Sequence, residues 1–452
     1  MIARRFSQVC FLVLLLLIVS LCTAGAVRHV LIGGSRFGEV QKEFILNFAQ
    51  FPNLVWRVIS EVAQTGEPSP LRIKVQDAER ANWNELFPQP TDSGFLLLSG
   101  LNRDTKKSDV RLIRISDNKT MAQWSPDWPT ISERTNTKDW YRSKQSTSSF
   151  IALHPLPLPG GDLVFNTGFS LVRVKSCSSN IDWVLDSMAH HSIEFGRNQK
   201  SFWVPGTVKN GYGGNRTFQD RLRDDSLMKV SLEGTILENI SFSDILIENG
   251  LSALLFGSLS QVDQRDPIHM NQISEAPNST LYWEAGDLLI SARHLSSVIL
   301  YRPSTRKIVW YKHGPWNRQH SAKFVGNSQI SVFDNNIVDL DVGNFEFLGP
   351  SFINRVFVFD FSTGDVVEPY VKMLEKMQPR SPTNGRSEIL ADGSLFFEET
   401  DRGRHFRVSE NGLLWSRVNH YNEADVGRVG WSRYLAKMEG EKIIADLKRA
   451  GC

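Results

Sequence analysis

The chain has 452 residues, of which 41% are apolar and 10% aromatic, and it carries 51 basic against 49 acidic side chains. This composition excludes a disordered chain and predicts a globular protein of one large domain or two to three ordinary ones. A net charge of +2 argues against nucleic acid as the main partner, because phosphate-binding surfaces usually show a basic excess.

The first 26 residues have the pattern of a targeting segment. Arg4 and Arg5 precede a long apolar run, and small residues end it at Ala24, Gly25 and Ala26. This pattern predicts a secretory signal peptide cleaved after Ala26, and the alternative is an uncleaved membrane anchor, since the run is close to the lower length limit for a span. Both interpretations predict an exported protein that is periplasmic or secreted.

Two cysteines follow this segment, Cys177 and Cys452, and the sequence leaves their pairing open. No CxxC motif or His/Cys cluster indicates a structural zinc site.

Residues 27–85 have a helical pattern. Phe37, Val40, Phe44 and Phe48 follow the spacing of one helix face, and Pro52 interrupts it. We expect a helical segment that covers the main domain or links it to the membrane. A partner-binding amphipathic helix is the alternative.

A repeated unit fills residues 86–438. It consists of an alternating apolar strand, a polar turn and a second strand that often ends in tryptophan, and its copies begin at residues 112, 171, 227, 298, 356 and 405. Each interval is long enough for a four-stranded sheet with its loops. Six such sheets arranged radially predict an all-β fold, a six-bladed β-propeller, followed by a C-terminal tail at 439–452. An irregular pair of β-sandwiches is the alternative that this regularity disfavours.

Histidines mark the starts of successive repeats. His154, His191, His269 and His320 each stand four positions before an apolar residue, and Arg386 has the same spacing. Each would begin the innermost strand of a blade. The radial symmetry of a propeller therefore predicts that these five side chains gather at the mouth of one central channel.

The residue types around this predicted ring suit an anionic substrate. Imidazoles serve as metal ligands, as acid–base groups and as nucleophiles. The nearby carboxylates Asp266 and Glu388 are not clear ligands, so we predict no metal site. The candidate substrate-binding residues include several cationic and amide donors that suit a sulfate or phosphate ester. These candidates are Asn271, Arg318, Gln319, His154 and Arg386, together with Arg293 as a further donor.

Three stretches resemble the bacterial arylsulfotransferases that do not use the nucleotide sulfate donor. They are "HHSIEF" at 190–195, "DPIHMN" at 266–271 and "GPWNRQHSAKFVGNSQISVFDNN" at 314–336, and the resemblance covers roughly residues 100–435. It implies a six-bladed propeller. It also implies transfer of a sulfuryl group from a small phenolic sulfate ester to a phenol acceptor, by a ping-pong route and without a cofactor.

The resemblance also implies roles for individual residues. His320 would carry the sulfuryl group as a sulfohistidine, and His269, Arg293 and one histidine of the pair at 190–191 would hold its oxygens. The spacing favours His191 over His190. Trp316 is the nearest candidate for a wall that stacks on aromatic substrates, with a place in a blade core as the alternative.

Two other functions use the same ring of residues. One is a metal-dependent lactonase or esterase, and the other is a non-catalytic exported propeller that binds an anionic ligand. Members of the resembling family carry a larger N-terminal β domain linked to dimer formation, so the oligomeric state is left open.

Overall fold

The computed structural model describes residues 41, 71–74, 92–135, 150–176, 179–257, 265–337 and 353–452. The chain divides into two compact units, Met1–Ser69 and Pro70–Cys452, and the second contains every feature below. The expected signal peptide or anchor and most of the expected helical segment lie outside the described residues, as does Cys177. Within the part of the chain that the structure describes, no helix is long and apolar enough to cross a membrane.

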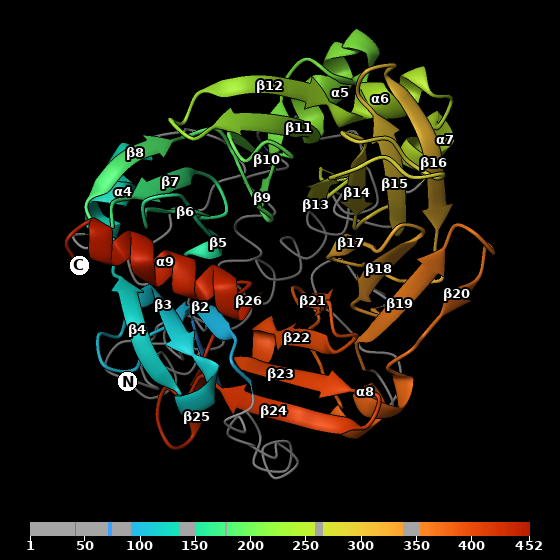
Figure 1. Ribbon diagram of the computed structural model, residues 1–452. Coiled ribbons are helices and arrows are strands. Elements are labelled where there is room, and N and C mark those ends of the chain that lie inside the picture. Colours follow the sequence, from blue (N-terminus) through green and yellow to red (C-terminus); the bar gives the residue numbers. More distant parts are fainter. Residues whose placement is uncertain are drawn as a thin grey trace, which may run out of the picture. The chain divides into compact units, whose positions relative to one another are not determined.

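Six four-stranded antiparallel sheets are arranged radially around a common centre (Figure 1), which confirms the predicted six-bladed propeller. Named from the centre outwards, the first blade is β26 (Arg433–Leu435), β2 (Phe95–Leu101), β3 (Ser108–Arg114) and β4 (Lys119–Trp124). The second is β5 (Leu153–Pro157), β6 (Leu163–Asn166), β7 (Leu171–Val174) and β8 (Ile181–Leu185). The third is β9 (Glu194–Phe195), β10 (Ser201–Val208), β11 (Asp224–Ser231) and β12 (Ile236–Ser241).

The remaining three blades follow the same order. The fourth is β13 (Met270–Glu275), β14 (Leu288–Ala292), β15 (Ser297–Arg302) and β16 (Lys307–His313). The fifth is β17 (Ala322–Val325), β18 (Gln329–Asp334), β19 (Arg355–Asp360) and β20 (Val366–Val367). The sixth is β21 (Arg386–Ile389), β22 (Leu395–Glu399), β23 (Arg404–Ser409) and β24 (Gly412–Val418).

The six repeats predicted from the sequence are the third and fourth strands of these blades. Their start positions fall in β3, β7, β11, β15, β19 and β23. The ring is closed by strands from distant parts of the chain, because β26 pairs with β2 and aligns Leu435 with Phe95. The innermost strand of the first blade is therefore the last strand of the chain.

The apolar core lies between neighbouring blades. The middle strands are buried on both sides, as in β14, where all five residues are buried. The outer strand β16 instead alternates exposed and half-buried residues. Middle strands are almost continuously apolar because the next blade covers each of their faces, and this stacking is what holds the repeats together.

Helices occupy the connections and the periphery. They are α4 (Trp128–Arg134), α5 (Arg216–Arg221), α6 (Phe242–Glu248), α7 (Ser252–Gly257), α8 (Val371–Met377) and α9 (Lys437–Arg449). Short 3-10 turns occur at η1 (Ile115–Asp117), η2 (Tyr212–Gly214) and η3 (Thr400–Arg402).

Two segments differ from the sequence expectations. Within the segment expected to be helical, Arg72–Lys74 form a strand, β1, which pairs with β25 (Asp425–Gly427). The residues expected to be a tail form α9, whose Ile443 and Leu447 join the core cluster of the first two blades. In both cases contacts with distant parts of the chain stabilise the local structure. These contacts are strand pairing for β1 and core packing for α9. Cys452, just after α9, is disulfide-bonded.

A methyl group at Gly440 is expected to destabilise the propeller. This glycine faces β2 from α9, and a Cβ there would overlap the buried ring of Phe95. We expect Gly440→Ala to cost about 1–3 kcal/mol, which outweighs the gain in helix propensity. Thermal unfolding measures this, with the exposed Lys442→Ala as control, and equal melting temperatures for the two variants would contradict the expected packing.

Candidate active site

The four histidines picked out by their spacing start the inner strands of four consecutive blades. His154 is the second residue of β5, and His191, His269 and His320 come shortly before β9, β13 and β17. Three of their rings form one cluster. The ring of His191 lies 4.9 Å from that of His269 and 6.1 Å from that of His320, measured between centroids. Arg386 begins β21 in the same ring of inner strands.

Several blade starts share a strained backbone conformation. His154, His191 and His269 have φ of 54°, 59° and 50°, and Trp431 has φ of 57°. Non-glycine residues in this left-handed region are uncommon and tend to gather at functional sites. Trp431 also stands four positions before Leu435, at the start of the closing strand β26. It is therefore the counterpart of the histidines in the first blade.

Trp431 is a site residue that sequence reasoning missed. Its ring centroid lies 5.5 Å from that of His154, 5.3 Å from that of His191 and 6.0 Å from that of His320. The four-residue spacing to Leu435 was the available clue. It was overlooked because the closing strand lies outside the six repeats.

Trp316, which we expected to form the aromatic wall, lies elsewhere. It is 1% exposed and belongs to the apolar cluster between the fourth and fifth blades, where its ring lies 6.3 Å from that of Phe357. The alternative of a blade-core tryptophan is therefore the correct one. The aromatic surface beside the imidazoles comes from Trp431.

The imidazole of His320 is buried, and only one of its two ring nitrogens makes a well-formed hydrogen bond within the described residues. Its Nδ1 lies 2.5 Å from the Oδ1 of Asn335, and its Nε2 makes no well-formed hydrogen bond within the described residues. Burial, followed by the positive charge of Arg293, lowers the pKa of His320 to about 3. The imidazole is therefore neutral at physiological pH. Asn335 belongs to the motif that carries the resemblance, but its amide type gave no indication of a role.

Carboxylates stand behind the other two central imidazoles. The Nδ1 of His269 lies 2.6 Å from the Oδ2 of Asp266. The Nδ1 of His191 lies 2.7 Å from the Nδ1 of His190, whose Nε2 lies 3.4 Å from the Oδ1 of Asp225. Both members of the HH pair thus belong to the site, with His191 central and His190 behind it.

Burial is also the main cause that sets the charge of these imidazoles. It holds the pKa of His269 well below its usual range, and Arg293 and Arg223 lower the pKa further. Burial also holds the pKa of His191 well below its usual range, and the nearby His269 lowers this pKa further. The resting site therefore contains three neutral imidazoles beside cationic guanidinium groups.

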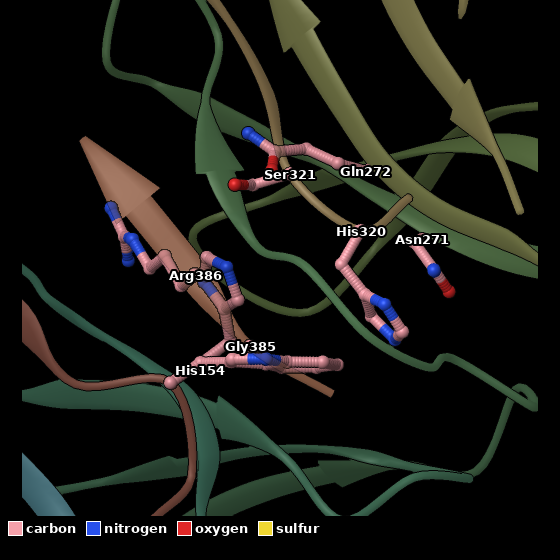
Figure 2. Close-up of a pocket in the computed structure, with 8 residues that line it drawn as sticks. His154, Asn271, Gln272, His320, Ser321, Gly385 and Arg386 are labelled. Carbon is pink, nitrogen blue, oxygen red and sulfur yellow. The ribbon is translucent and has the colours of Figure 1, made fainter. Parts of the chain in front are cut away.

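A small pocket adjoins His320 (Figure 2). Its lining residues are His154, Asn271, Gln272, His320, Ser321, Gly385, Arg386 and Trp431. Figure 2 shows the imidazole of His320 next to Asn271, with His154 and Arg386 on the other side of the pocket. The enclosed part of the pocket is far smaller than the 300–1,000 Å³ usual for drug-sized ligands, so an entire aromatic ligand does not fit inside it.

Charged residues of the inner strands surround this pocket. Arg386 donates to Glu388 over 2.8 Å, while its buried Nε and Nη1 have no partner among the described residues. Lys323 lies 3.4 Å from Glu194 and 3.5 Å from Glu388. Arg433 lies 3.2 Å from Glu194. Three cations against two carboxylates leave an excess of positive charge, which suits an anionic ligand.

Two of the predicted donors anchor the loop of His320. Gln319 is fully buried, and its Nε2 donates to Ser291, Ala292 and Ser297 of the fourth blade. Its side chain therefore does not line the pocket, which corrects the expected binding role. Arg318, just before it, donates its backbone N–H to the hydroxyl of Ser296 over 3.3 Å.

Asn271 lines the pocket as expected and contacts the same loop. Its Nδ2 donates to the carbonyl of Gln319 over 3.1 Å, which leaves its buried Oδ1 without a partner among the described residues.

One group of side chains has the spacing of a metal site. Asp266, His269 and His294 offer ligand atoms within 4.8 Å of one another, and they are the trio with this property in the described part of the chain. The Nη1 of Arg223 lies 3.5 Å from the same Asp266 oxygen that contacts His269. A metal ion there would face the charge of this guanidinium, so the trio fits a resident metal poorly.

A family model described as arylsulfotransferase (ASST) matches residues 170–420, more than half of the chain. No curated protein sequence matches the chain.

Several solved structures show distant likeness. A protein of unknown function from Bacteroides caccae is 11% identical, with a TM-score of 0.44, and the match covers 76% of this chain and 99% of that one. TolB from Acinetobacter baumannii is 10% identical, with a TM-score of 0.41, covering 76% of this chain and 67% of that one. Likeness at this level carries no argument about function.

Proposed function

Because the chain belongs to the arylsulfotransferase family, we propose that it moves a sulfuryl group from a phenolic sulfate ester to a phenol acceptor through a sulfohistidine on His320. The observation that carries this proposal is the neutral, buried imidazole of His320, whose Nε2 makes no well-formed hydrogen bond within the described residues and which lines a pocket together with Arg386. No other imidazole of the ring combines these features.

The first half-reaction loads the histidine. The lone pair of Nε2 attacks sulfur, the ester S–O bond breaks, and the phenolate leaves with the bonding electrons. Arg293 is 6% exposed and its backbone N–H donates to the carbonyl of His269 over 3.0 Å, so we propose that its charge stabilises the sulfuryl oxygens. In the second half-reaction the acceptor oxygen attacks sulfur while its proton passes to His269, and the N–S bond breaks with its electron pair returning to Nε2.

Protons for this chemistry come from the carboxylate-backed imidazoles. A bound sulfate ester brings negative charge, which favours protonated over neutral histidine. His269 combines the Asp266 carboxylate at 2.6 Å with a side chain that is 24% exposed, so it can take a proton from solvent. We assign His269 to protonation of the departing phenolate and His191 to the sulfuryl oxygens.

Because the pocket is small, we propose that the aromatic part of the substrate lies outside it. Trp431 lines the pocket beside three of the imidazoles and is 4% exposed, so we propose that only the part of its ring that faces the pocket contacts a phenol ring. We propose small aromatic sulfates and phenols as the substrates, and no nucleic acid partner.

We also propose that the protein is exported, either secreted or periplasmic, and cleaved or anchored at its N-terminal segment. The bonded Cys452 supports an oxidising compartment, where disulfides persist.

The first test is to trap the loaded histidine. The wild type is mixed with 4-nitrophenyl sulfate without acceptor and quenched at alkaline pH, where the N–S bond survives. We expect about one nitrophenolate per chain and a mass gain of about 80 Da, the mass of SO₃, on the peptide that contains His320. A burst without this adduct would refute the sulfohistidine.

A metal-dependent esterase is the second candidate, favoured only by the trio of Asp266, His269 and His294. Treatment with a chelator separates the two. The sulfotransferase proposal predicts an unchanged burst, whereas a metal-dependent esterase would lose turnover and recover it on addition of zinc or manganese.

A further inference from the structure

The orientation of one buried amide is fixed by its surroundings. Asn335 follows β18 directly and is 0% exposed. Its Nδ2 donates to the carbonyl of Ser381 over 2.7 Å and to that of Asn384 over 2.9 Å. A carbonyl only accepts, so the amide nitrogen must face these two groups and the amide oxygen must face His320.

The two carbonyls are themselves held in place. They lie in the connection between α8 and β21 of the sixth blade. Asn354 accepts from the backbone N–H of Ser381 over 2.6 Å and donates to its carbonyl over 3.1 Å. The carboxylate of Asp401 accepts from the backbone N–H of Asn384 over 3.2 Å. Asn335 therefore has no alternative orientation that keeps its hydrogen bonds.

This arrangement decides which nitrogen of His320 carries the hydrogen. The Oδ1 of Asn335 can only accept, and it lies 2.5 Å from Nδ1, so Nδ1 must donate. In a neutral imidazole the other nitrogen, Nε2, then holds a lone pair. This is the nitrogen that makes no well-formed hydrogen bond within the described residues, although the backbone of Thr383 also lies near the ring.

The three central imidazoles differ in what stands behind them. A neutral amide contacts Nδ1 of His320, whereas the Asp266 carboxylate contacts that of His269. Behind His191, the Nε2 of His190 faces two acceptors, the Oδ1 of Asp225 and the carbonyl of Gly206, each at 3.4 Å. A carboxylate stabilises a protonated imidazole and a neutral amide does so much less. Histidines at equivalent positions in different blades therefore differ in how strongly their neighbours stabilise the protonated imidazole.

We propose that Asn335 is a positioning residue that holds His320 as the Nδ1–H tautomer and so makes Nε2 the nucleophilic nitrogen of the sulfotransferase. This inference rests on the proposed function. On attack, Nε2 forms the N–S bond, the ester S–O bond breaks and the phenolate leaves with its electron pair. The Nδ1 hydrogen stays on the ring, donated to Asn335, so the loaded imidazole carries one positive charge. That charge makes it a good leaving group for the acceptor.

The test reads the tautomer directly. The full chain is labelled with ¹⁵N-histidine, and two-bond proton–nitrogen spectra are recorded, with His320 assigned by comparison with His320→Gln. We expect a lone-pair shift for Nε2 and a protonated shift for Nδ1 in the wild type. In Asn335→Ala we expect a mixture of tautomers, and a nitrophenolate burst slowed by roughly 10²-fold with little change in KM, since an incorrect tautomer disables a catalytic histidine.

Asn419→Ala is the matched control. It also removes a buried amide whose Nδ2 donates to two backbone carbonyls, those of Leu101 and Gly427, but within the described residues Asn419 contacts neither His320 nor the groups that orient Asn335. We expect it to keep the wild-type tautomer and a burst near the wild-type rate. The wild-type spectrum is informative even if Asn335→Ala fails to fold.

The proposal is overturned if wild-type His320 carries its hydrogen on Nε2. Equal spectra and burst rates in Asn335→Ala and Asn419→Ala would overturn it as well. A protonated Nδ1 in the wild type that is lost in Asn335→Ala, without any sulfated His320, would support the positioning role while the sulfotransferase function fails.

Discussion

Replacing His320 with glutamine is expected to lower the kcat for aryl sulfate turnover by roughly 10⁴-fold or more. Glutamine keeps a polar side chain of similar reach but has no nucleophilic nitrogen to accept the sulfuryl group. KM is expected to change little, because Arg293, His269 and the pocket remain to bind the ester. Steady-state release of nitrophenolate in the presence of phenol measures this effect.

Two further variants separate chemistry from folding. His320→Ala leaves a space beside the pocket, and added free imidazole is expected to restore part of its turnover, whereas imidazole has no effect on His320→Gln. His313→Gln, on the exposed face of the outer strand β16, is expected to retain wild-type turnover. Wild-type activity in His320→Gln would eliminate the covalent mechanism.

The second large effect concerns stability at acid pH. The free energy of unfolding is expected to fall by roughly 3–5 kcal/mol between pH 6.5 and 5, a large part of the 5–15 kcal/mol typical of a folded protein. The cause is a group of six histidines whose pKa values are all lowered mainly by burial. They are His154, His190, His191, His269, His294 and His320.

The direction follows from proton binding. In the unfolded chain these imidazoles protonate near pH 6.5, while in the folded protein they stay neutral to lower pH. Below pH 6.5 the unfolded state thus binds more protons, so stability is fully present above that pH and is lost as the pH falls.

Buried acids oppose this loss in part. Burial raises the pKa of Asp224 and of Asp334 to about 7, and it also raises the pKa of Asp109 and of Glu399. These carboxyls bind protons in the folded state first, so they add stability as the pH falls towards 4. The six histidines outweigh them in the range near pH 6.

Urea unfolding at pH 5, 6, 7 and 8 measures the effect. His154→Gln is expected to reduce the pH dependence by removing one buried imidazole, and the exposed His420→Gln to leave it unchanged. Stability that stays constant or rises from pH 7 to 5 would show that the imidazoles are not neutral in the folded protein.

Periodic features of this protein were predictable from the sequence. The outer hairpins repeat because every blade must pack its apolar strands against two neighbouring blades. The same repetition places histidines at equivalent positions in four blades. Once the repeats were aligned, the central gathering of His191, His269 and His320 followed from symmetry.

Features that depend on contacts between distant segments were not predictable. Trp431 belongs to a strand that joins the first blade from the other end of the chain. Asn335 acquires its role only because the connection before β21 presents two carbonyls to it. Trp316 is the converse case, since its place inside the motif at 314–336 does not reveal that its ring lies in the core between two blades.

The closing strand β26 also affects how the protein is made. Trp431 and Arg433 join the site only when this last strand pairs with β2, next to one of the first. A polypeptide that stops before residue 431 lacks part of the site and leaves the ring open. The candidate site is therefore complete only after the final strand has been synthesised, so we expect products truncated before residue 431 to lack the proposed activity.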